Sequence, residues 1–262
     1  MKYRKKGRWP RMHSLVANIR NETLKIAYKK KTVFFLIMTI LIPIGAGLLI
    51  ANFQSSIGIG AIAAKDFPIA MLGLFTAIFL PLFVFMGASD QFSGELGDRT
   101  LKIVLTRPIS RFKVFASKQI SLGIYIIAYL AAAFIASILS SLLLLQGSGK
   151  LGAAFISWII AYGAAFLPLI TLSVIAVLLA QFFSSSSGAL TTSILLYIAA
   201  KAAAFFFPQV STYSPTSYTE WHLMWIGSQM ASGKVFSVFI FLLACSILCF
   251  TAGFYFFDKK EL

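Results

Sequence analysis

Six apolar runs of membrane-crossing length alternate with polar stretches along the chain. The runs cover residues 32–52, 67–88, 119–145, 154–180, 188–207 and 235–257. A helix needs about 20 predominantly apolar residues to cross the hydrocarbon core of a bilayer, and a helix satisfies its own backbone hydrogen bonds in lipid. The pattern therefore predicts an all-α membrane protein whose six transmembrane helices form a single domain over residues 32–257.

The residues before the first run fall into two parts. Residues 1–11 are basic and lack apolar periodicity, whereas from Ser14 onward apolar residues recur at helical spacing opposite polar ones. Residues 1–31 therefore predict a cytoplasmic tail and an amphipathic helix that lies along the membrane surface and leads into the first span. A solvated cytoplasmic helix is the alternative, but its apolar stripe would have nothing to pack against. Residues 258–262 form a short cytoplasmic C-terminus.

The composition excludes a water-soluble protein. Of the 262 residues, 59% are hydrophobic and 12% are charged, and the mean hydropathy is +0.86. We expect no room for a separate catalytic domain. The GxxxxGK[ST] phosphate-binding motif is also absent, because the pairs Gly149-Lys150 and Gly233-Lys234 lack the upstream glycine.

The basic residues indicate the topology. The net charge is +15, and of the 23 basic residues eleven precede the first run, six lie between the second and third runs and two follow the last. The alternate connections hold only Lys65, Lys150 and Lys234. The positive-inside rule therefore predicts a multi-pass protein of the cytoplasmic membrane with both termini in the cytoplasm. Contacts with lipids account for the charge better than nucleic-acid binding, and we expect no nucleic-acid partner.

Charged residues are almost missing from the six predicted spans. They contain no Asp or Glu, which argues against a carrier coupled to protons or sodium, since such carriers usually keep a carboxylate at membrane depth. Lys201 is the one basic residue inside them. It lies near the outer end of the fifth span, so we expect it to snorkel to the surface, with a place on a substrate path as the alternative.

Catalytic and metal-binding residue sets are missing too. Cys245 and Cys249 lie one helical turn apart in the last run, where we expect them to pack as small apolar residues rather than form a disulfide. His13 and His222 fall on opposite sides of the membrane, and neither HExxH nor GxSxG occurs. A membrane-embedded enzyme is therefore disfavoured, and we expect no metal or cofactor in this chain.

The connection between the second and third spans, residues 89–118, predicts a helical elbow outside the membrane. Gly94 and Gly97 are expected to break the preceding helix, and Asp98 to cap a short new one. Ser110 is expected to cap the start of the third span. Glu95 and Asp98 would then lie near the exposed tip of the elbow.

This connection resembles the signature of ABC-2-type transporter permeases. The resemblance rests on Phe92-Ser-Gly-Glu95, Arg99-Thr-Leu-Lys102, Leu105-Thr-Arg-Pro-Ile-Ser-Arg111 and Lys118. Arg99 departs from the glycine that many family members have before Thr-Leu. The amphipathic N-terminal helix, the six spans, a serine-rich turn at residues 184–187 and a long outer connection follow the order of the family.

The resemblance implies an exporter subunit without a nucleotide site of its own. In that family the elbow is a coupling helix that docks on a separate cytoplasmic ATPase, which binds ATP and Mg²⁺, and two permeases assemble with two ATPases. The residues implied in docking and bracing are Phe92, Glu95, Arg99, Thr100, Arg107, Pro108 and Arg111. A membrane scaffold or sensory partner of an ATPase that does not transport is the alternative.

The outer connection between the fifth and sixth spans, residues 208–234, contains a further aromatic group. Ser217 and Glu220 have capping-box spacing, and Tyr218, Trp221 and Trp225 would share a helix face. Such a helix most often anchors at the membrane interface. The resemblance instead implies re-entrant helices that cap a translocation path, in which these aromatic residues would form an outer gate.

Overall fold

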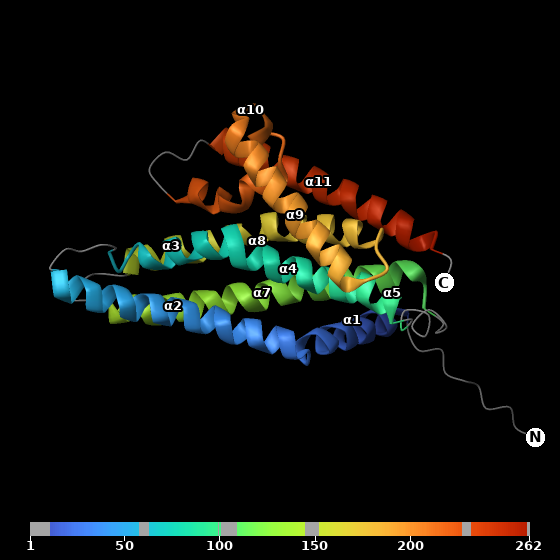
Figure 1. The fold of residues 1–262 in the computed structure, drawn as a ribbon, viewed down its shortest axis with the longest axis horizontal. Coiled ribbons are helices and arrows are strands. Elements are labelled where there is room, and N and C mark those ends of the chain that lie inside the picture. Colours follow the sequence, from blue (N-terminus) through green and yellow to red (C-terminus); the bar gives the residue numbers. More distant parts are fainter. Residues whose placement is uncertain are drawn as a thin grey trace, which may run out of the picture.

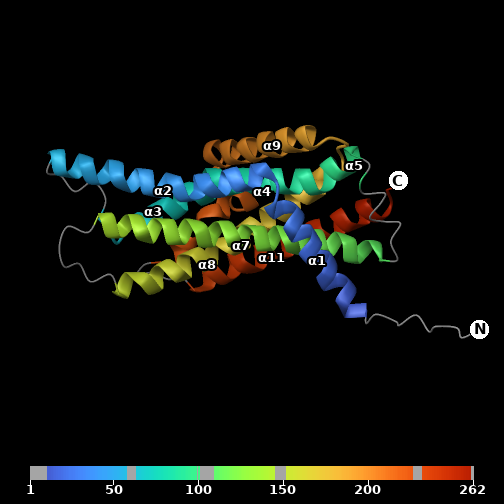
Figure 2. The same ribbon diagram turned by 90° about the horizontal axis from the view of Figure 1, so that it is seen from below.

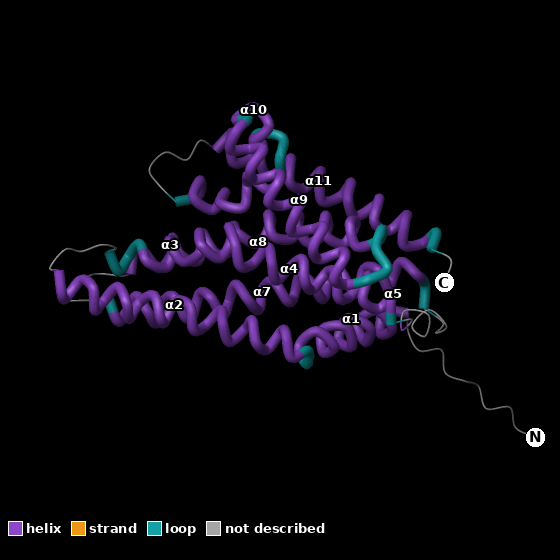
Figure 3. The backbone as a smooth tube through the Cα atoms, in the orientation of Figure 1, coloured by secondary structure: helices purple, strands orange, loops and turns teal. Residues whose placement is uncertain are grey.

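The computed structural model describes residues 11–57, 63–98, 100, 109–144, 152–226 and 232–260. Helices joined by short turns make up these residues, and none of them is in a strand (Figure 3). Six helical segments in the described part are long and apolar enough to cross a membrane, which confirms the predicted all-α membrane fold. The single long helices are α1 (Arg11–Ala27), α2 (Lys30–Ile57), α7 (Arg111–Leu143), α8 (Gly152–Ala180), α9 (Ser186–Phe206) and α11 (Ser232–Asp258).

The second span is a continuous rod that is longer than predicted. It comprises α3 (Phe67–Leu74), the π-helix η1 (Phe75–Phe79), α4 (Leu80–Ser89), the π-helix η2 (Asp90–Gly94) and α5 (Glu95–Gly97). The expected break at Gly94 is wrong, because this residue has helical dihedral angles of φ −65° and ψ −48°. Glycine weakens a helix but does not forbid it when neighbouring segments pack against it. The π-turn at residues 90–94 instead changes the direction in which the following side chains point.

Helix α7 lies at the centre of the bundle. Helices α1 and α2 pack on one side of it and α8 on another, as two perpendicular views show (Figures 1 and 2). The largest core cluster joins Phe83 of α4, Tyr129 of α7 and Leu169 of α8. The Tyr129 hydroxyl also donates to the carbonyl of Thr32 over 2.8 Å, which fixes the start of α2 against α7.

The outer surface of the bundle is apolar. Large aliphatic side chains such as Leu49, Ile156 and Leu195 are more than half exposed. A contiguous apolar surface of this extent is rare on soluble monomers and suits contact with lipid chains. The exposed aliphatic surface therefore agrees with a multi-pass membrane protein.

One end of the bundle gathers segments that are distant in sequence. Helix α1, α5, the start of α7 and the end of α11 all lie there (Figure 1). Helix α7 begins at Arg111, with Ser110 at the N-cap position, although the Ser110 hydroxyl makes no capping hydrogen bond. The third helix therefore starts directly after Ser110, as predicted, about two turns before the apolar run at residue 119 begins, and it brings additional basic residues into the bundle.

Candidate functional site

A fully buried lysine lies at this end of the bundle. The side chain of Lys118 on α7 has no exposed surface. Its ammonium nitrogen lies 3.0 Å from Glu22 Oε2 and 2.7 Å from Glu95 Oε2, and it donates to the carbonyl of Gln91 over 3.2 Å. An ammonium group has three protons to donate, so these three acceptors satisfy it. Lys118 thus connects α7 to α1 and to α5.

A second lysine closes the arrangement into a ring. Lys25 Nζ lies 2.8 Å from Glu22 Oε1 and 3.2 Å from Glu95 Oε1. Each carboxylate therefore accepts from both lysines, and the two positive charges balance the two negative ones. We refer to Glu22, Lys25, Glu95 and Lys118 as the ion-pair ring. Because three helices contribute to it, no two of them can separate without breaking an ion pair.

Glu22 and Lys25 of the ring are held in their charged forms around neutral pH. Burial by itself raises the pKa of Glu22, but the nearby charges of Lys118 and Lys25 outweigh it and hold that pKa below the ordinary value of 4.5. For Lys25, burial lowers the pKa, yet hydrogen bonds and attraction from Glu22 and Glu95 raise it above 10.5. The charged forms are therefore the stable ones in the folded protein.

Aromatic side chains pack beside the ion-pair ring. Lys118 Nζ lies 5.8 Å from the ring centroid of Phe92, within the range of a cation–π contact. Phe92 is buried, and its ring packs edge-on against Phe115 and Phe257 at centroid distances of 5.5 and 6.2 Å. We expected Phe92 in the exposed elbow. It is instead a core residue that joins the rod of the second span to α7 and α11.

Helix α1 attaches to the bundle through its polar face. Asn18, Glu22 and Ile26 recur every four residues and are all buried, and Asn18 Nδ2 donates to Ser117 Oγ on α7 over 2.5 Å. Val16 and Leu24, in contrast, are exposed on the side that would meet lipid. The structure thus buries Asn18 and Glu22, from the polar side of the amphipathic pattern, together with Ile26 from its apolar side.

A second ionic cluster lies beside the ring. Asp90 Oδ2 accepts from Lys29 Nζ over 3.3 Å, and Lys31 Nζ lies 3.8 Å from Asp90 Oδ1. The hydroxyl of Ser186, at the first turn of α9, also donates to Asp90 Oδ1. Asp90 therefore joins the start of α2 to the start of α9.

The serine-rich turn packs tightly against the rod. A Cβ atom added to Gly97 would lie 2.5 Å from the backbone oxygen of Ser184, a distance that only glycine permits. Ser93 Oγ also donates to the carbonyl of Ala180 at the end of α8 over 2.9 Å. The turn at residues 184–187 and the end of the second rod are thus held together.

These contacts change the expected distribution of charge. The second rod contains Asp90 and Glu95, and the third helix contains Lys118, so these two helices carry charges that the predicted spans, which end at residue 88 and begin at residue 119, do not. Both helices extend beyond their apolar runs, toward the end of the bundle that holds the ion-pair ring. Glu95 was expected at the exposed tip of the elbow, but its side chain is 15% exposed and belongs to the ring.

The other predicted elbow residues occupy varied positions. Thr100 is exposed, and its hydroxyl donates to the carbonyl of Glu95 over 3.3 Å. Arg111 donates to the backbone carbonyls of Asp258 and Lys260, the latter over 3.2 Å, and so caps the end of α11. Arg99, Arg107 and Pro108 lie outside the described residues.

The outer connection folds against the bundle. After α10 (Pro208–Ser211), residues Pro215–Trp225 form the 3₁₀-helix η3, which packs on α8, α9 and α11. Its N-cap residue is Ser214 and Glu220 has non-helical dihedral angles, so the capping box predicted at residues 217 and 220 is wrong. A 3₁₀-helix has three residues per turn, so the capping-box spacing that applies to an α-helix does not apply to this segment.

The aromatic residues of η3 do cluster. Trp221 is buried against Val238 and Leu242 of α11, with Tyr218 and Trp225 packed beside it. Trp221 Nε1 donates to the carbonyl of Ala164 on α8 over 2.6 Å. Trp221 therefore serves as an internal packing residue, whereas Tyr218 and Trp225 keep part of their surface exposed, so anchoring at the interface stays a prediction for these two. Whether the cluster gates a path stays a prediction.

Lys201 is partly buried and contacts the outer connection. Its ammonium donates to Thr219 Oγ1 of η3 over 2.9 Å and lies 6.0 Å from the ring centroid of Tyr197. Snorkelling and a place on a substrate path both stay predictions. Lys201 thus fixes η3 to α9.

The described residues hold no cluster of three or more metal-ligating side chains. His222 is fully buried in η3, and burial lowers its pKa to about 4, so the imidazole is neutral at physiological pH. The free thiols of Cys245 and Cys249 are partly buried in α11. None of these groups forms a catalytic arrangement.

Sequence reasoning missed the roles of Glu22, Asp90 and Lys118. Glu22 did carry a signal, because it is the single acidic residue among the first 31 and it shares a helix face with Asn18. Lys118 appeared only as part of the family signature. Their pairing across α1, α5 and α7 depends on tertiary packing that no local pattern encodes.

The comparison with protein-family models agrees with this architecture. Residues 18–200 match the model described as ABC-2 family transporter protein, and this match covers all four residues of the ion-pair ring and the part of α1 from Asn18 onward. No curated protein matches the chain. Because the match extends over more than half of the sequence, the chain belongs to the ABC-2 transporter family, whose members are the membrane components of ABC transporters.

Proposed function

We propose that the protein is the permease subunit of an ATP-driven exporter, and that a separate cytoplasmic ATPase docks at the elbow after α5. The observation that supports this most strongly is the ion-pair ring. It links the start of the elbow to α1 and α7 through buried charges. An elbow linked in this way transmits a push or pull from an ATPase directly to the membrane helices.

The energetics of the ring favour rigid-body motion. Moving α5 alone would take Glu95 away from Lys118 and leave a buried ammonium partly unpaired, which typically costs about 3–5 kcal/mol. Moving α5, α1 and the start of α7 together preserves every ion pair. Nucleotide binding in the ATPase would then select between two packings of the whole group against the rest of the bundle.

We propose that two copies of the chain enclose the transport path. Helix α9 is packed on the bundle along one side only, and Leu195, Leu196 and Ile198 face outward. A second α9 would cover this surface. Native mass spectrometry of the detergent-solubilised complex should find two permeases with two ATPases, whereas an active one-to-one complex would contradict the proposal.

The proposed orientation places the ring on the cytoplasmic side. The concentration of basic residues before α2 and around α7 supports it. Cysteines introduced at Ser55 and Ser211 should react with an impermeant thiol reagent in intact cells, and a cysteine at Ser110 should not. Labelling at position 110 from outside would overturn this orientation.

The proposal is tested by co-expressing the chain with a separate ABC ATPase subunit from the same genome and measuring capture and vectorial transport in proteoliposomes. Asp98→Lys reverses an exposed charge at the start of the elbow and should weaken capture, because charge-assisted contacts with the partner are lost. Arg4→Glu in the N-terminal tail is the matched control. Equal capture by both variants would contradict docking at the elbow.

A scaffold that binds an ATPase without transport is the second candidate. It predicts the same capture and the same sensitivity to Asp98→Lys. It differs in the vesicle experiment, because a scaffold would leave the distribution of candidate amphiphiles unchanged on addition of ATP, whereas a permease would concentrate one of them on one side.

A further inference from the structure

A fully buried histidine lies in the outer connection. His222 of η3 is 0% exposed, and neither of its ring nitrogens has a hydrogen-bond partner among the described residues. A neutral imidazole carries one N–H donor and one acceptor, and both cost free energy when they are buried without partners. His222 is therefore poorly satisfied even in its neutral form.

Unsatisfied polar atoms are concentrated in the same short helix. Ten buried side-chain atoms lack a partner among the described residues, and four of them lie in the eleven residues of η3: Ser217 Oγ, both ring nitrogens of His222 and Trp225 Nε1. Buried polar atoms are otherwise nearly always hydrogen-bonded. The polar pairing of η3 is therefore less complete than that of the rest of the described bundle.

The elements around η3 supply no buried carboxylate for a charged His222. Helix η3 packs against α8, α9, α11 and η1, and neither α8 nor η1 contains a charged residue. The one acidic residue of α11, Asp258, lies at the opposite end of that helix. The titratable side chains closest in the sequence of these elements are Tyr162 of α8, Tyr197 and Lys201 of α9, Lys234 of α11, and Tyr218 and Glu220 of η3 itself.

Glu220 does not change this picture, because its side chain is exposed while His222 is buried. The charged group that contacts the buried side of η3 is a cation, since Lys201 Nζ donates to Thr219 Oγ1. Thr219 is itself buried and lies three residues before His222. A proton on His222 would therefore add a second positive charge to this side of η3.

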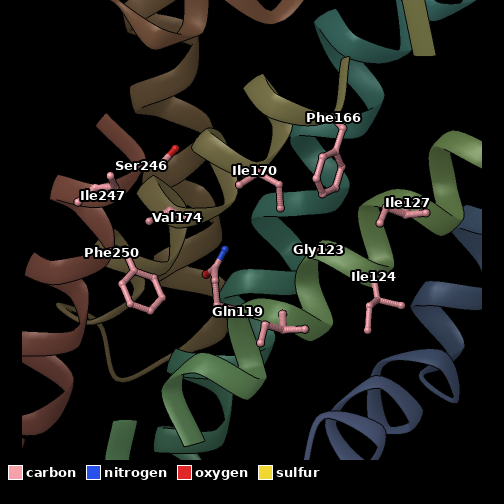
Figure 4. Close-up of a pocket in the computed structure, with 11 residues that line it drawn as sticks. Gln119, Gly123, Ile124, Ile127, Phe166, Ile170, Val174, Ser246, Ile247 and Phe250 are labelled. Atoms are coloured by element: carbon pink, nitrogen blue, oxygen red, sulfur yellow. The ribbon is translucent and has the colours of Figure 1, made fainter. Parts of the chain in front are cut away.

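The hollow on the flank of the bundle offers no water to His222. It has a volume of about 510 Å³, and Figure 4 shows side chains of α7, α8 and α11 around it, among them Gln119, Phe166 and Phe250. No residue of η3 is part of this lining. Because His222 is fully buried and does not border this space, a charge on its ring is hydrated by moving η3 away from the bundle.

We propose that η3 is a pH-sensitive latch, which is closed on α8 and α11 while His222 is neutral and is released when His222 takes up a proton. An imidazolium has two N–H donors and a full charge, so protonation in the closed state buries a charge without a carboxylate beside it, which is unfavourable. In the released state the ring meets water. The inference concerns this chain alone and does not depend on the proposed ATPase.

Acid favours the released state. Burial lowers the pKa of His222 from 6.5 to about 4 in the closed state, and the backbone of Thr219 offsets this effect only in part. The closed state is therefore most stable above pH 6.5 and loses stability as the pH falls from 6.5 toward 4. The equilibrium constant for release should be about ten-fold larger at pH 5.5 than at pH 7.5.

Hydrogen exchange of the purified full-length chain in lipid nanodiscs tests the latch. Protection factors over residues 215–225 are measured at pH 5.5 and pH 7.5, each corrected for the intrinsic exchange rate at that pH, with residues 122–130 of α7 as the internal reference. The protection of η3 should fall about ten-fold at pH 5.5, while that of the reference should not change. Equal protection of η3 at both pH values would overturn the proposal.

Two substitutions that take up no proton identify the titrating group. His222→Gln keeps a neutral polar side chain and His222→Phe keeps a buried ring, and in each variant η3 should be equally protected at both pH values. Because the two variants alter the packing in different ways, misfolding of one does not explain a response lost from both. Glu220→Gln, at an exposed position of the same helix, is the matched control and should keep the ten-fold response. A response that persists in the His222 variants, or that disappears in Glu220→Gln, would contradict a latch controlled by His222.

Discussion

Lys118 Nζ lies 3.0 Å from Glu22 Oε2, although 96 residues separate them in the sequence. The contact joins the amphipathic N-terminal helix to the third membrane helix, and Glu95 joins the same lysine from the second rod. Buried ion pairs are weak evidence for stability, because desolvation offsets their attraction, but losing one partner is costly. The ring therefore acts chiefly to specify how the three helices fit together.

Replacing Lys118 by Met should destabilise the protein by about 3–5 kcal/mol, because it leaves two carboxylates, Glu22 and Glu95, to share the single cation of Lys25. Unfolding in mixed micelles by a denaturing detergent measures this loss. Lys30→Met at an exposed position of α2 is the control and should change stability by less than about 0.5 kcal/mol. A Lys118→Met variant as stable as the control would show that the ring is not intact.

The attachment of α1 should weaken in acid. The pKa of Glu22 is lowered in the folded protein, so its contribution is fully present above the ordinary carboxyl pKa of 4.5 and is lost as the pH falls through the lowered value. The pKa of Lys25 is raised, so its contribution is lost only at strongly alkaline pH. A spin label at Val16 should therefore become mobile at low pH and stay ordered near neutrality.

Glu22→Gln provides the comparison for this titration. Without the carboxylate, the mobility of the label should be higher at neutral pH and should change little on acidification. If the parental protein and Glu22→Gln gave the same pH profile, Glu22 would not be the titrating group that holds α1.

Gly97→Ala and Gly94→Ala form a matched pair. The added methyl group at position 97 would lie 2.5 Å from the Ser184 backbone oxygen, whereas at position 94 its nearest neighbour would be Ser186 Cβ at 3.5 Å. Gly97→Ala should therefore displace the serine-rich turn and lower the melting temperature, while Gly94→Ala should be neutral or slightly stabilising. Circular dichroism melts in detergent measure both, and equal melting temperatures would refute the close approach.

Thr219→Val should loosen η3. The change removes the acceptor for Lys201 Nζ, and a hydrogen bond to a charged donor contributes about 1.5–3 kcal/mol. Backbone hydrogen exchange over residues 215–225 should accelerate by about ten-fold or more. Thr212→Val, at an exposed position before η3, should leave exchange unchanged; similar protection in both variants would mean that Lys201 does not hold η3.

The sequence predicted the fold better than the site. Apolar runs identify membrane helices because every backbone group must be satisfied within lipid, and this constraint gave six helices with their order. It could not predict where the helices end. Residues 89–97 and 111–118 are too polar to score as spans, yet they continue the helices because their charges pair with one another inside the bundle.

The site residues depended on those helix ends. With the second helix predicted to break at Gly94, Glu95 seemed exposed, and although Ser110 was predicted to begin the third helix, nothing in the sequence showed that Lys118 faces inward. The family signature still pointed to both residues. The contact between Lys201 and Thr219 was missed for a related reason, since no sequence pattern reveals that Thr219 folds back to meet this lysine.

The central claim is that the ion-pair ring passes the movement of a bound ATPase into the membrane helices. The most direct test is the rate of thiol labelling at Leu223→Cys, an exposed position of η3, in a complex whose native Cys245 and Cys249 are replaced by Ser. A non-hydrolysable ATP analogue should change this rate several-fold in the parental complex. In a Lys118→Met complex that still retains the ATPase, and in the milder Glu22→Gln complex, the nucleotide should have little effect. An equal response in all three complexes would contradict the account.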